Sequence, residues 1–153
     1  MHVGQLDKET QDLLANLWEV ESYARSASTL DKYQAALRLG KKPTLEKGKK
    51  LFQDVKVLIN LRNALVHFKP EWVIADTGRV DQADLHILEM NLRNKFTLNP
   101  FLRDARPLFP TICMSHGCAK WAVESAIAFV ERFYGEMGMT NPLDKIRSSL
   151  GTQ

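Results

Sequence analysis

The chain has very few cysteines and no long apolar run, and these two absences exclude several classes of protein. Of its 153 residues only Cys113 and Cys118 carry thiols, which is too few for the disulfide framework of a small secreted domain. No stretch reaches the roughly 20 apolar residues that a membrane-spanning helix needs, and no secretory leader is recognisable. We therefore expect a soluble, cytoplasmic protein with reduced thiols and no membrane contact.

A strong charge of one sign is also absent. Lys and Arg together number 21 and Asp and Glu 18, which leaves a net charge of +3. Proteins that bind nucleic acid through charge alone are usually more basic, so this balance permits RNA binding without arguing for it. The histidines His2, His86 and His116 lack metal-ligand spacing, and the glycines form no phosphate loop. We expect neither a metal nor a cofactor.

The pattern that is present is helical. Apolar residues recur at three- and four-residue spacing, and the predicted helices begin at Asp7, Ser28, Thr44, Asp81 and Ser115. The first two helices could also be one bent helix. The pattern predicts an all-α fold, an antiparallel bundle of four to five helices. The length fits a single domain over residues 1–153, with a core over about 6–138 and a polar tail, 139–153, that frays.

Two connections in this scheme are long. Within the first, Glu71 to Val80, the residues 72–74 could form a short strand. The second, residues 97–111, contains Pro100, Pro107 and Pro110 and so cannot be helical throughout. Because apolar residues separate these prolines, we expect the segment to pack against the bundle, and connections of this length are often functional.

The last long helix is expected to run from Ser115 to about Met137. Its alanines Ala119, Ala122 and Ala126 fall on one face, and we expect this face to pack against the helix that begins at Thr44. Trp121 lies on another side, so it is either half-buried in the bundle or part of a subunit contact. Both alternatives stay open at this point.

The helix expected from Thr44 to about Phe68 holds the one convincing candidate for a chemical site, the run Arg62-Asn63-Ala64-Leu65-Val66-His67. At ~100° per residue, Arg62 falls in the middle of an apolar arc. The arc consists of Leu51, Val55, Leu58, Ile59, Leu65 and Val66. Asn63 and His67 are four residues apart and lie one above the other at its edge, beside Lys56 and Asn60.

Each side chain in this run suits one chemical task. An arginine on an apolar face needs either a buried acidic partner, such as Glu124 or Asp31, or an anion from outside. Its planar fork of donors fits carboxylate and phosphate. His67, in the last turn, can gain and lose a proton near neutral pH, and Asn63 can orient the ring or a ligand. A purely structural role, with Arg62 in an internal ion pair, stays open.

The same run resembles the motif of HEPN domains, small helical bundles with Arg, a polar residue, three variable residues and His near the end of a long helix. The sharp match covers Leu61–Pro70. The resemblance implies a metal-independent endoribonuclease, often a toxin or defence effector, that cleaves RNA through its 2′-hydroxyl. It implies catalytic roles for Arg62 and His67, with Asn63 as the accessory polar position. It also implies an antitoxin or nucleotidyltransferase partner. Some HEPN domains only bind nucleotides or proteins, which leaves a non-catalytic module as an alternative.

Two further observations concern RNA binding and assembly. Six lysines, Lys41, Lys42, Lys47, Lys49, Lys50 and Lys56, stand before and along the motif helix against Glu46 and Asp54. They could track an RNA backbone or form a solvated helix start, and we take Lys49, Lys56 and Asn60 as candidate RNA-binding residues. Because Arg62 and His67 point ~140° apart on one helix, we expect a homodimer that adds a second motif to the site.

Overall fold

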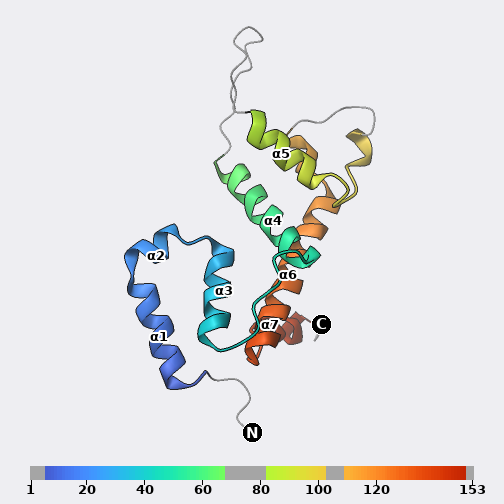
Figure 1. Ribbon diagram of the computed structural model, residues 1–153. Coiled ribbons are helices and arrows are strands. Elements are labelled where there is room, and N and C mark those ends of the chain that lie inside the picture. The colour runs from blue at the N-terminus through green and yellow to red at the C-terminus, as the bar shows by residue number, and fades with distance from the viewer. Residues whose placement is uncertain (1–5, 68–81, 103–108, 151–153) are drawn as a thin grey trace. The chain divides into compact units, whose positions relative to one another are not determined.

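The computed structural model describes residues 6–67, 82–102 and 109–150, and within these ranges the chain is all-helical, as the periodicity predicted (Figure 1). The helices are α1 (Lys8–Glu19), α2 (Glu21–Ser26), α3 (Thr29–Leu39), α4 (Lys50–Val66), α5 (Gln82–Leu92), α6 (His116–Met137) and α7 (Leu143–Leu150), with 3-10 helices η1 (Pro100–Leu102) and η2 (Thr111–Cys113). The possible strand at 72–74 lies outside the described residues. None of the helices described is both long and apolar enough to cross a membrane.

The chain forms two compact units, unit 1 with residues 1–49 and 128–153 and unit 2 with residues 50–127. In unit 1, Asp7 caps α1 through a hydrogen bond of 2.9 Å from the Thr10 amide to its carboxylate. Ser28 caps α3 by accepting a hydrogen bond of 3.2 Å from the Asp31 amide. Such caps satisfy amides that the first helical turn leaves free. The extended backbone at Val20 and Ala27 separates α1, α2 and α3, so the alternative of one bent helix is wrong.

Unit 1 is held together by aromatic and aliphatic packing of α3 on the second half of α6. The Tyr33 ring lies edge-on to Phe129 and Phe133, with ring centroids 5.0 and 4.7 Å apart. Leu37 is completely buried, and Met137 is 5% exposed. Edge-to-face aromatic pairs add specificity to the hydrophobic burial.

The prediction that the motif helix begins at Thr44 is wrong, because α4 begins at Lys50. The buried side chain of Gln34 holds the preceding connection in place. Its Nε2 donates to the Leu45 carbonyl at 2.6 Å, and its Oε1 accepts from the Leu45 amide at 3.0 Å. Both backbone groups of Leu45 are thereby satisfied outside a helix, so the helix starts only after Gly48.

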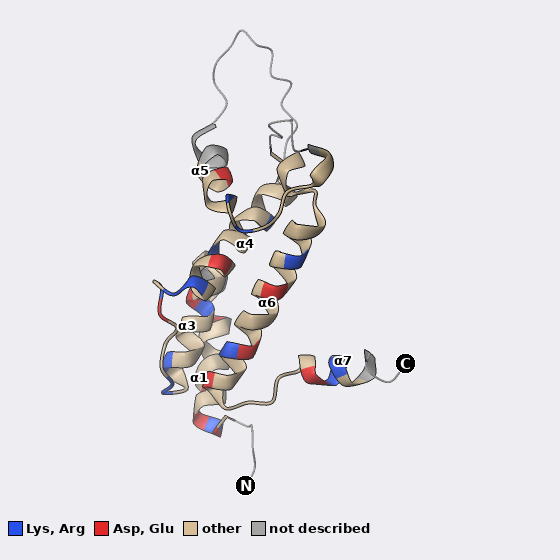
Figure 2. Ribbon diagram, turned by 90° about the vertical axis from the view of Figure 1, so that its right-hand side faces the viewer, with Lys and Arg blue, Asp and Glu red and all other residues tan. Residues whose placement is uncertain are grey.

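The predicted fraying of the polar tail is also wrong for residues 143–150, whereas residues 151–153 lie outside the described residues. Residues 143–150 form α7, which begins where the Asn141 side chain accepts a hydrogen bond of 3.0 Å from the Leu143 amide. Arg147 of α7 pairs with Glu131 of α6 at 2.6 Å, and charged positions of both signs mark this short helix in Figure 2. A cap and an ion pair thus stabilise a helix in a segment whose polar composition alone does not favour one.

The core of unit 2 joins the motif helix to α5 and the first half of α6. It contains Val57, Leu61, Leu88, Leu92, Phe109, Cys118 and Trp121. Phe109 belongs to the proline-rich connection, so part of that segment packs down as predicted, whereas Phe101 is 93% exposed. α5 ends at Leu92, and Asn94 follows in a left-handed conformation with φ 62°.

The predicted packing of α6 against α4 is confirmed, because both helices contribute to one core and Ala122 packs against it, but the alanine face as a whole is not the buried face. Trp121 and Ser125 are buried, whereas Ala119 and Ala126 are exposed. Burial of one indole removes more apolar surface from water than burial of several alanine methyl groups, so the helix turns Trp121 inward. Of the two alternatives for Trp121, the structure supports burial within one chain.

The two cysteines lie in the same core. Burial, followed by the proximity of Cys118, raises the pKa of the Cys113 thiol to about 12. Burial also raises the pKa of Cys118. Thiols with raised pKa values are protonated and unreactive at neutral pH, so these cysteines act as small apolar residues.

A buried carboxylate fastens α4 to the segment after α5. Asp54 is 4% exposed and accepts hydrogen bonds from Lys50 Nζ at 2.7 Å and Lys95 Nζ at 2.5 Å. Burial alone would raise the pKa of this carboxyl, but the hydrogen bonds and charges of the two lysines outweigh burial and hold the pKa below its ordinary value.

Replacement of Asp54 with asparagine should lower the free energy of unfolding by about 3 kcal/mol at pH 7, because it removes the charge that pairs two lysines. A carboxyl whose pKa is lowered by folding stabilises the protein above its unfolded pKa of about 4, and this contribution is lost as the pH falls further.

Urea unfolding at pH 7 and pH 3 measures this pH dependence. The gap between the unfolding free energies of wild type and Asp54→Asn should be smaller at pH 3 than at pH 7. Glu124→Gln, in an exposed pair 3.9 Å from Lys120, is the control and should cost under about 0.5 kcal/mol. An equal gap at both pH values would contradict the prediction.

Candidate functional site

The candidate site occupies the last two turns of α4, in unit 2. The His67 amide donates to the Asn63 carbonyl at 3.0 Å and closes the final turn of the helix. Leu61 is 3% exposed and anchors this end of α4 in the core, whereas Arg62, Asn63 and His67 are all exposed. The helix thus presents the three polar motif residues to solvent from a fixed backbone.

Of the two alternatives left open for Arg62, the structure does not show the buried ion pair. Its side chain is exposed, and no described carboxylate lies within ion-pair distance of it. Of the two acidic partners considered, Glu124 lies 3.9 Å from Lys120 and Asp31 accepts a hydrogen bond from Ser28. The guanidinium therefore keeps donors available for an anion from outside the described chain.

The apolar arc around Arg62 exists, but its C-terminal half is not covered by the described residues of the unit. Val55 is buried, whereas Leu65 and Val66 are 45% and 60% exposed. The C-terminal half of α4 enters the core mainly through Val57 and Leu61. Arg62 therefore lies on an exposed surface with apolar neighbours, not inside the fold.

A hydrogen bond between adjacent side chains orients the arginine. Arg62 Nη1 donates to Asn63 Oδ1 at 3.0 Å. Asn63 is one turn before His67 and shares its side of the helix. On a helical wheel Arg62 and His67 diverge by ~140°, but this bond draws the guanidinium toward the side that carries the imidazole.

The motif continues into a longer row of polar side chains, which we call the polar stripe. It consists of Lys56, Asn60, Asn63 and His67, spaced four, three and four residues apart and all exposed. This spacing places all four on one side of α4. Two of the three predicted RNA-binding residues, Lys56 and Asn60, thus join the motif. Lys49 belongs to unit 1 and lies 3.5 Å from the Glu46 carboxylate.

The exposed surface of α4 carries positive charge without negative charge. The helix contains one carboxylate, Asp54, and this group is buried and paired with two lysines. The other ionisable positions within its bounds are Lys50, Lys56 and Arg62. A surface of this kind attracts anions and repels no phosphate group. In the sequence Asp54 reduces the positive charge of the lysine cluster, because its pairing with Lys95, 41 residues away, leaves no local signal.

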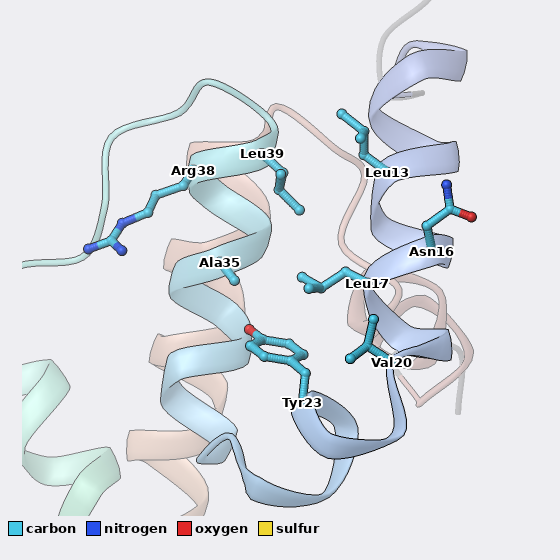
Figure 3. A pocket seen from close by; sticks show the side chains of 8 residues that line it. All are labelled: Leu13, Asn16, Leu17, Val20, Tyr23, Ala35, Arg38 and Leu39. Atoms are coloured by element: carbon cyan, nitrogen blue, oxygen red, sulfur yellow. The ribbon is translucent and has the colours of Figure 1, made fainter.

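A pocket of about 490 Å³ lies in unit 1 between α1 and α3 (Figure 3). Leu13, Leu17, Val20 and Leu39 line it, and Tyr23 closes one end, whereas Arg38 extends away from the space between the two helices. The lining is mostly apolar and contains no motif residue. The pocket lacks a group that would bind phosphate within it, so it does not share the chemistry of the motif. The sequence does not reveal this pocket, because helical spacing marks Leu13 and Leu17 as apolar positions without showing whether another element covers them.

Comparisons with known proteins yield no match: no family model, no curated protein and no solved structure is similar to this chain. A functional assignment therefore depends on the motif residues and their geometry. The relevant geometry is an oriented arginine, an amide and an imidazole on two turns of α4, whose one carboxylate, Asp54, is buried and paired.

Proposed function

We propose that the chain is a metal-independent endoribonuclease of the HEPN type, with Arg62, Asn63 and His67 as its catalytic residues. One observation carries the proposal. The Arg62 guanidinium is exposed, is free of described carboxylates and is bonded to Asn63 on the side of His67. A guanidinium that can bind an anion and an imidazole that can transfer a proton thus lie within two turns of α4, on a surface suited to phosphate.

In the reaction that these residues suit, the 2′-hydroxyl of RNA attacks the adjacent phosphorus. The 2′-oxygen loses its proton as the new P–O bond forms, and the 5′-oxygen leaves and gains a proton. The products are a 2′,3′-cyclic phosphate and a 5′-hydroxyl. His67 serves as the base or the acid, and Arg62 stabilises the charge that develops on the non-bridging phosphate oxygens.

A second copy of the chain would supply the second proton-transfer group, because one imidazole cannot donate and accept in the same step. Four of the exposed apolar residues of unit 2 suit a subunit contact: Leu65 and Val66 on α4, and Ile87 and Met90 on α5. We therefore propose a homodimer. The toxin or defence role, and an antitoxin or nucleotidyltransferase partner, belong to the same proposal.

Light scattering should return about twice the chain mass of 17.4 kDa for the wild type. Val66→Glu should shift the mass toward 17.4 kDa, because a charge in an apolar contact is costly to bury. Val123→Glu is a matched control, since Val123 is 57% exposed against 60% for Val66, and it should leave the dimer intact. A wild-type mass of 17.4 kDa, or equal dissociation by both variants, would contradict a dimer through this surface.

The proposed activity is tested with purified protein and single-stranded RNA in the presence of EDTA. We expect cleavage, because Arg62 and His67 fill the roles that a metal would otherwise take, and we expect a 2′,3′-cyclic phosphate end. DNA of the same sequence should survive because it lacks the 2′-hydroxyl. RNA binding without cleavage would instead favour the non-catalytic HEPN-like module. A 3′-hydroxyl product would exclude attack by the 2′-oxygen.

A further inference from the structure

The polar stripe extends well beyond the catalytic residues. With a rise of ~1.5 Å per residue, Asn60 lies ~10 Å and Lys56 ~16 Å from His67 along the helix axis. Both side chains are exposed on the side of α4 that carries His67. If successive nucleotides are stacked ~3.4 Å apart, 16 Å corresponds to about five nucleotides. A strand bound at His67 would therefore reach Lys56 only if it is several nucleotides long.

The two outer residues of the stripe are available for a ligand. Within the described part of the chain, no carboxylate lies within ion-pair distance of Lys56, and the Asn60 amide has no hydrogen-bond partner. Asn63 differs, because its Oδ1 accepts a hydrogen bond from Arg62. Asn60 is thus the amide of the stripe whose donor and acceptor both remain free.

The chemistry of these groups indicates what each one binds. A lysine ammonium pairs with a phosphate irrespective of sequence. An asparagine amide offers a donor and an acceptor side by side and matches the N7 and N6 positions of adenine. Base edges are open to such contacts in single-stranded RNA, whereas the deep groove of an RNA duplex hides them.

We infer that single-stranded RNA lies along the polar stripe of α4, with a phosphate on Lys56 and an adenine base on Asn60. This inference deepens the proposed function and depends on it for the position of the cleaved bond. In this arrangement Lys56 raises the affinity for RNA and Asn60 sets the preference among bases, two properties that the catalytic residues do not determine.

The role of Lys56 is tested by varying substrate length. Lys56→Gln should raise KM about tenfold on a long oligoadenylate and have a much smaller effect on the dinucleotide ApA, which cannot reach both ends of the stripe. The slope of log affinity against log salt concentration should fall by about one. Lys120→Gln removes the same charge from an exposed position on α6 and should do neither. An equal effect of Lys56→Gln on both substrates, or none on either, would overturn the assignment.

The role of Asn60 is tested by changing the amide to a carboxylate of the same shape. Asparagine favours adenine, whereas aspartate accepts a hydrogen bond from the cytosine amino group. Asn60→Asp should therefore lower the preference for oligoadenylate over oligocytidylate roughly tenfold. Asn91→Asp, at an exposed position on α5, introduces the same charge and should leave the preference unchanged. An unchanged preference in Asn60→Asp, with weaker binding to both oligomers, would overturn base reading.

Binding measurements separate this inference from the proposed activity. Fluorescence anisotropy with labelled oligoadenylate and oligocytidylate, on the His67→Ala background, reports the stripe without cleavage. If the wild type cleaves RNA but the Lys56 and Asn60 variants bind both oligomers like the wild type, the inference is wrong and the nuclease proposal stands. If the oligomers bind with the expected preferences but no RNA is cut, the nuclease proposal fails and the stripe remains a binding surface.

Discussion

Replacing His67 with alanine should reduce RNA cleavage by a factor of about 10²–10⁴, the usual contribution of a positioned general acid or base. The free energy of unfolding should stay within about 0.5 kcal/mol of the wild-type value, because the imidazole is exposed and leaves no cavity. Cleavage rates on single-stranded RNA in EDTA, together with thermal melts of both proteins, measure the two effects separately.

The matched control for this variant is His116→Ala. His116 is exposed at the start of α6, in the same unit but outside the motif, so its loss should leave cleavage unchanged. If wild type and His67→Ala degrade RNA equally, the activity comes from a contaminant. The non-catalytic HEPN-like module would then account better for the motif.

Replacing Arg62 with lysine should reduce cleavage by about 10²–10³, the range found when one donor to a developing oxyanion is removed. Lysine keeps the positive charge, but its ammonium is not planar. It therefore cannot donate to Asn63 and bind two phosphate oxygens at the same time, as the guanidinium can. Because Arg62 is exposed and has no described carboxylate partner, stability should hardly change. Arg93→Lys, at an exposed position after α5, is the control and should retain full activity. A melting temperature that falls in Arg62→Lys alone would indicate a structural role.

Mixing the two inactive variants tests whether the site is shared between copies. In a heterodimer, the Arg62→Lys chain supplies a native His67 and the His67→Ala chain supplies a native Arg62. These two residues meet in one site only if each site takes Arg62 from one chain and His67 from the other. Random assortment makes half of the dimers mixed, and each mixed dimer then has one site with a native Arg62 and a native His67. The activity of the mixture should exceed that of either variant alone but stay below a quarter of the wild-type value, because the second imidazole is missing from that site. An activity no higher than that of the separate variants would contradict a site that combines Arg62 and His67 from different chains.

The helix starts at Asp7, Ser28 and Ser115, each set by a local cap, were predicted from sequence, whereas the start of α4, which depends on a more distant residue, was not. Ser115 caps α6 as predicted, by accepting a hydrogen bond of 3.0 Å from the Cys118 amide. The start of α4 was misplaced because Gln34, eleven residues before Leu45, holds the intervening connection. Capping is a property of three or four adjacent residues, whereas a contact of this range leaves no periodic signal.

The candidate site shows the same division. Helical spacing correctly grouped Lys56 and Asn60 with Asn63 and His67, because residues that share a side of a helix follow from its period. The exposure of Arg62 could not be obtained in this way. Periodicity identifies an apolar arc, but whether another element covers it is decided by tertiary packing, and here the C-terminal half of α4 enters the core mainly through Val57 and Leu61.

The hydrogen bond between Arg62 and Asn63 also bears on the entropy of substrate binding. An arginine side chain has about 2 kcal/mol of rotamer entropy to lose when it is immobilised. The bond of 3.0 Å restricts the guanidinium before any phosphate arrives, so part of this loss already occurs when the protein folds. Nη1 is held by Asn63, and Nε and Nη2 remain as the edge that faces a phosphate. The site therefore meets its ligand with the arginine already partly ordered, and less freedom remains to be lost on binding.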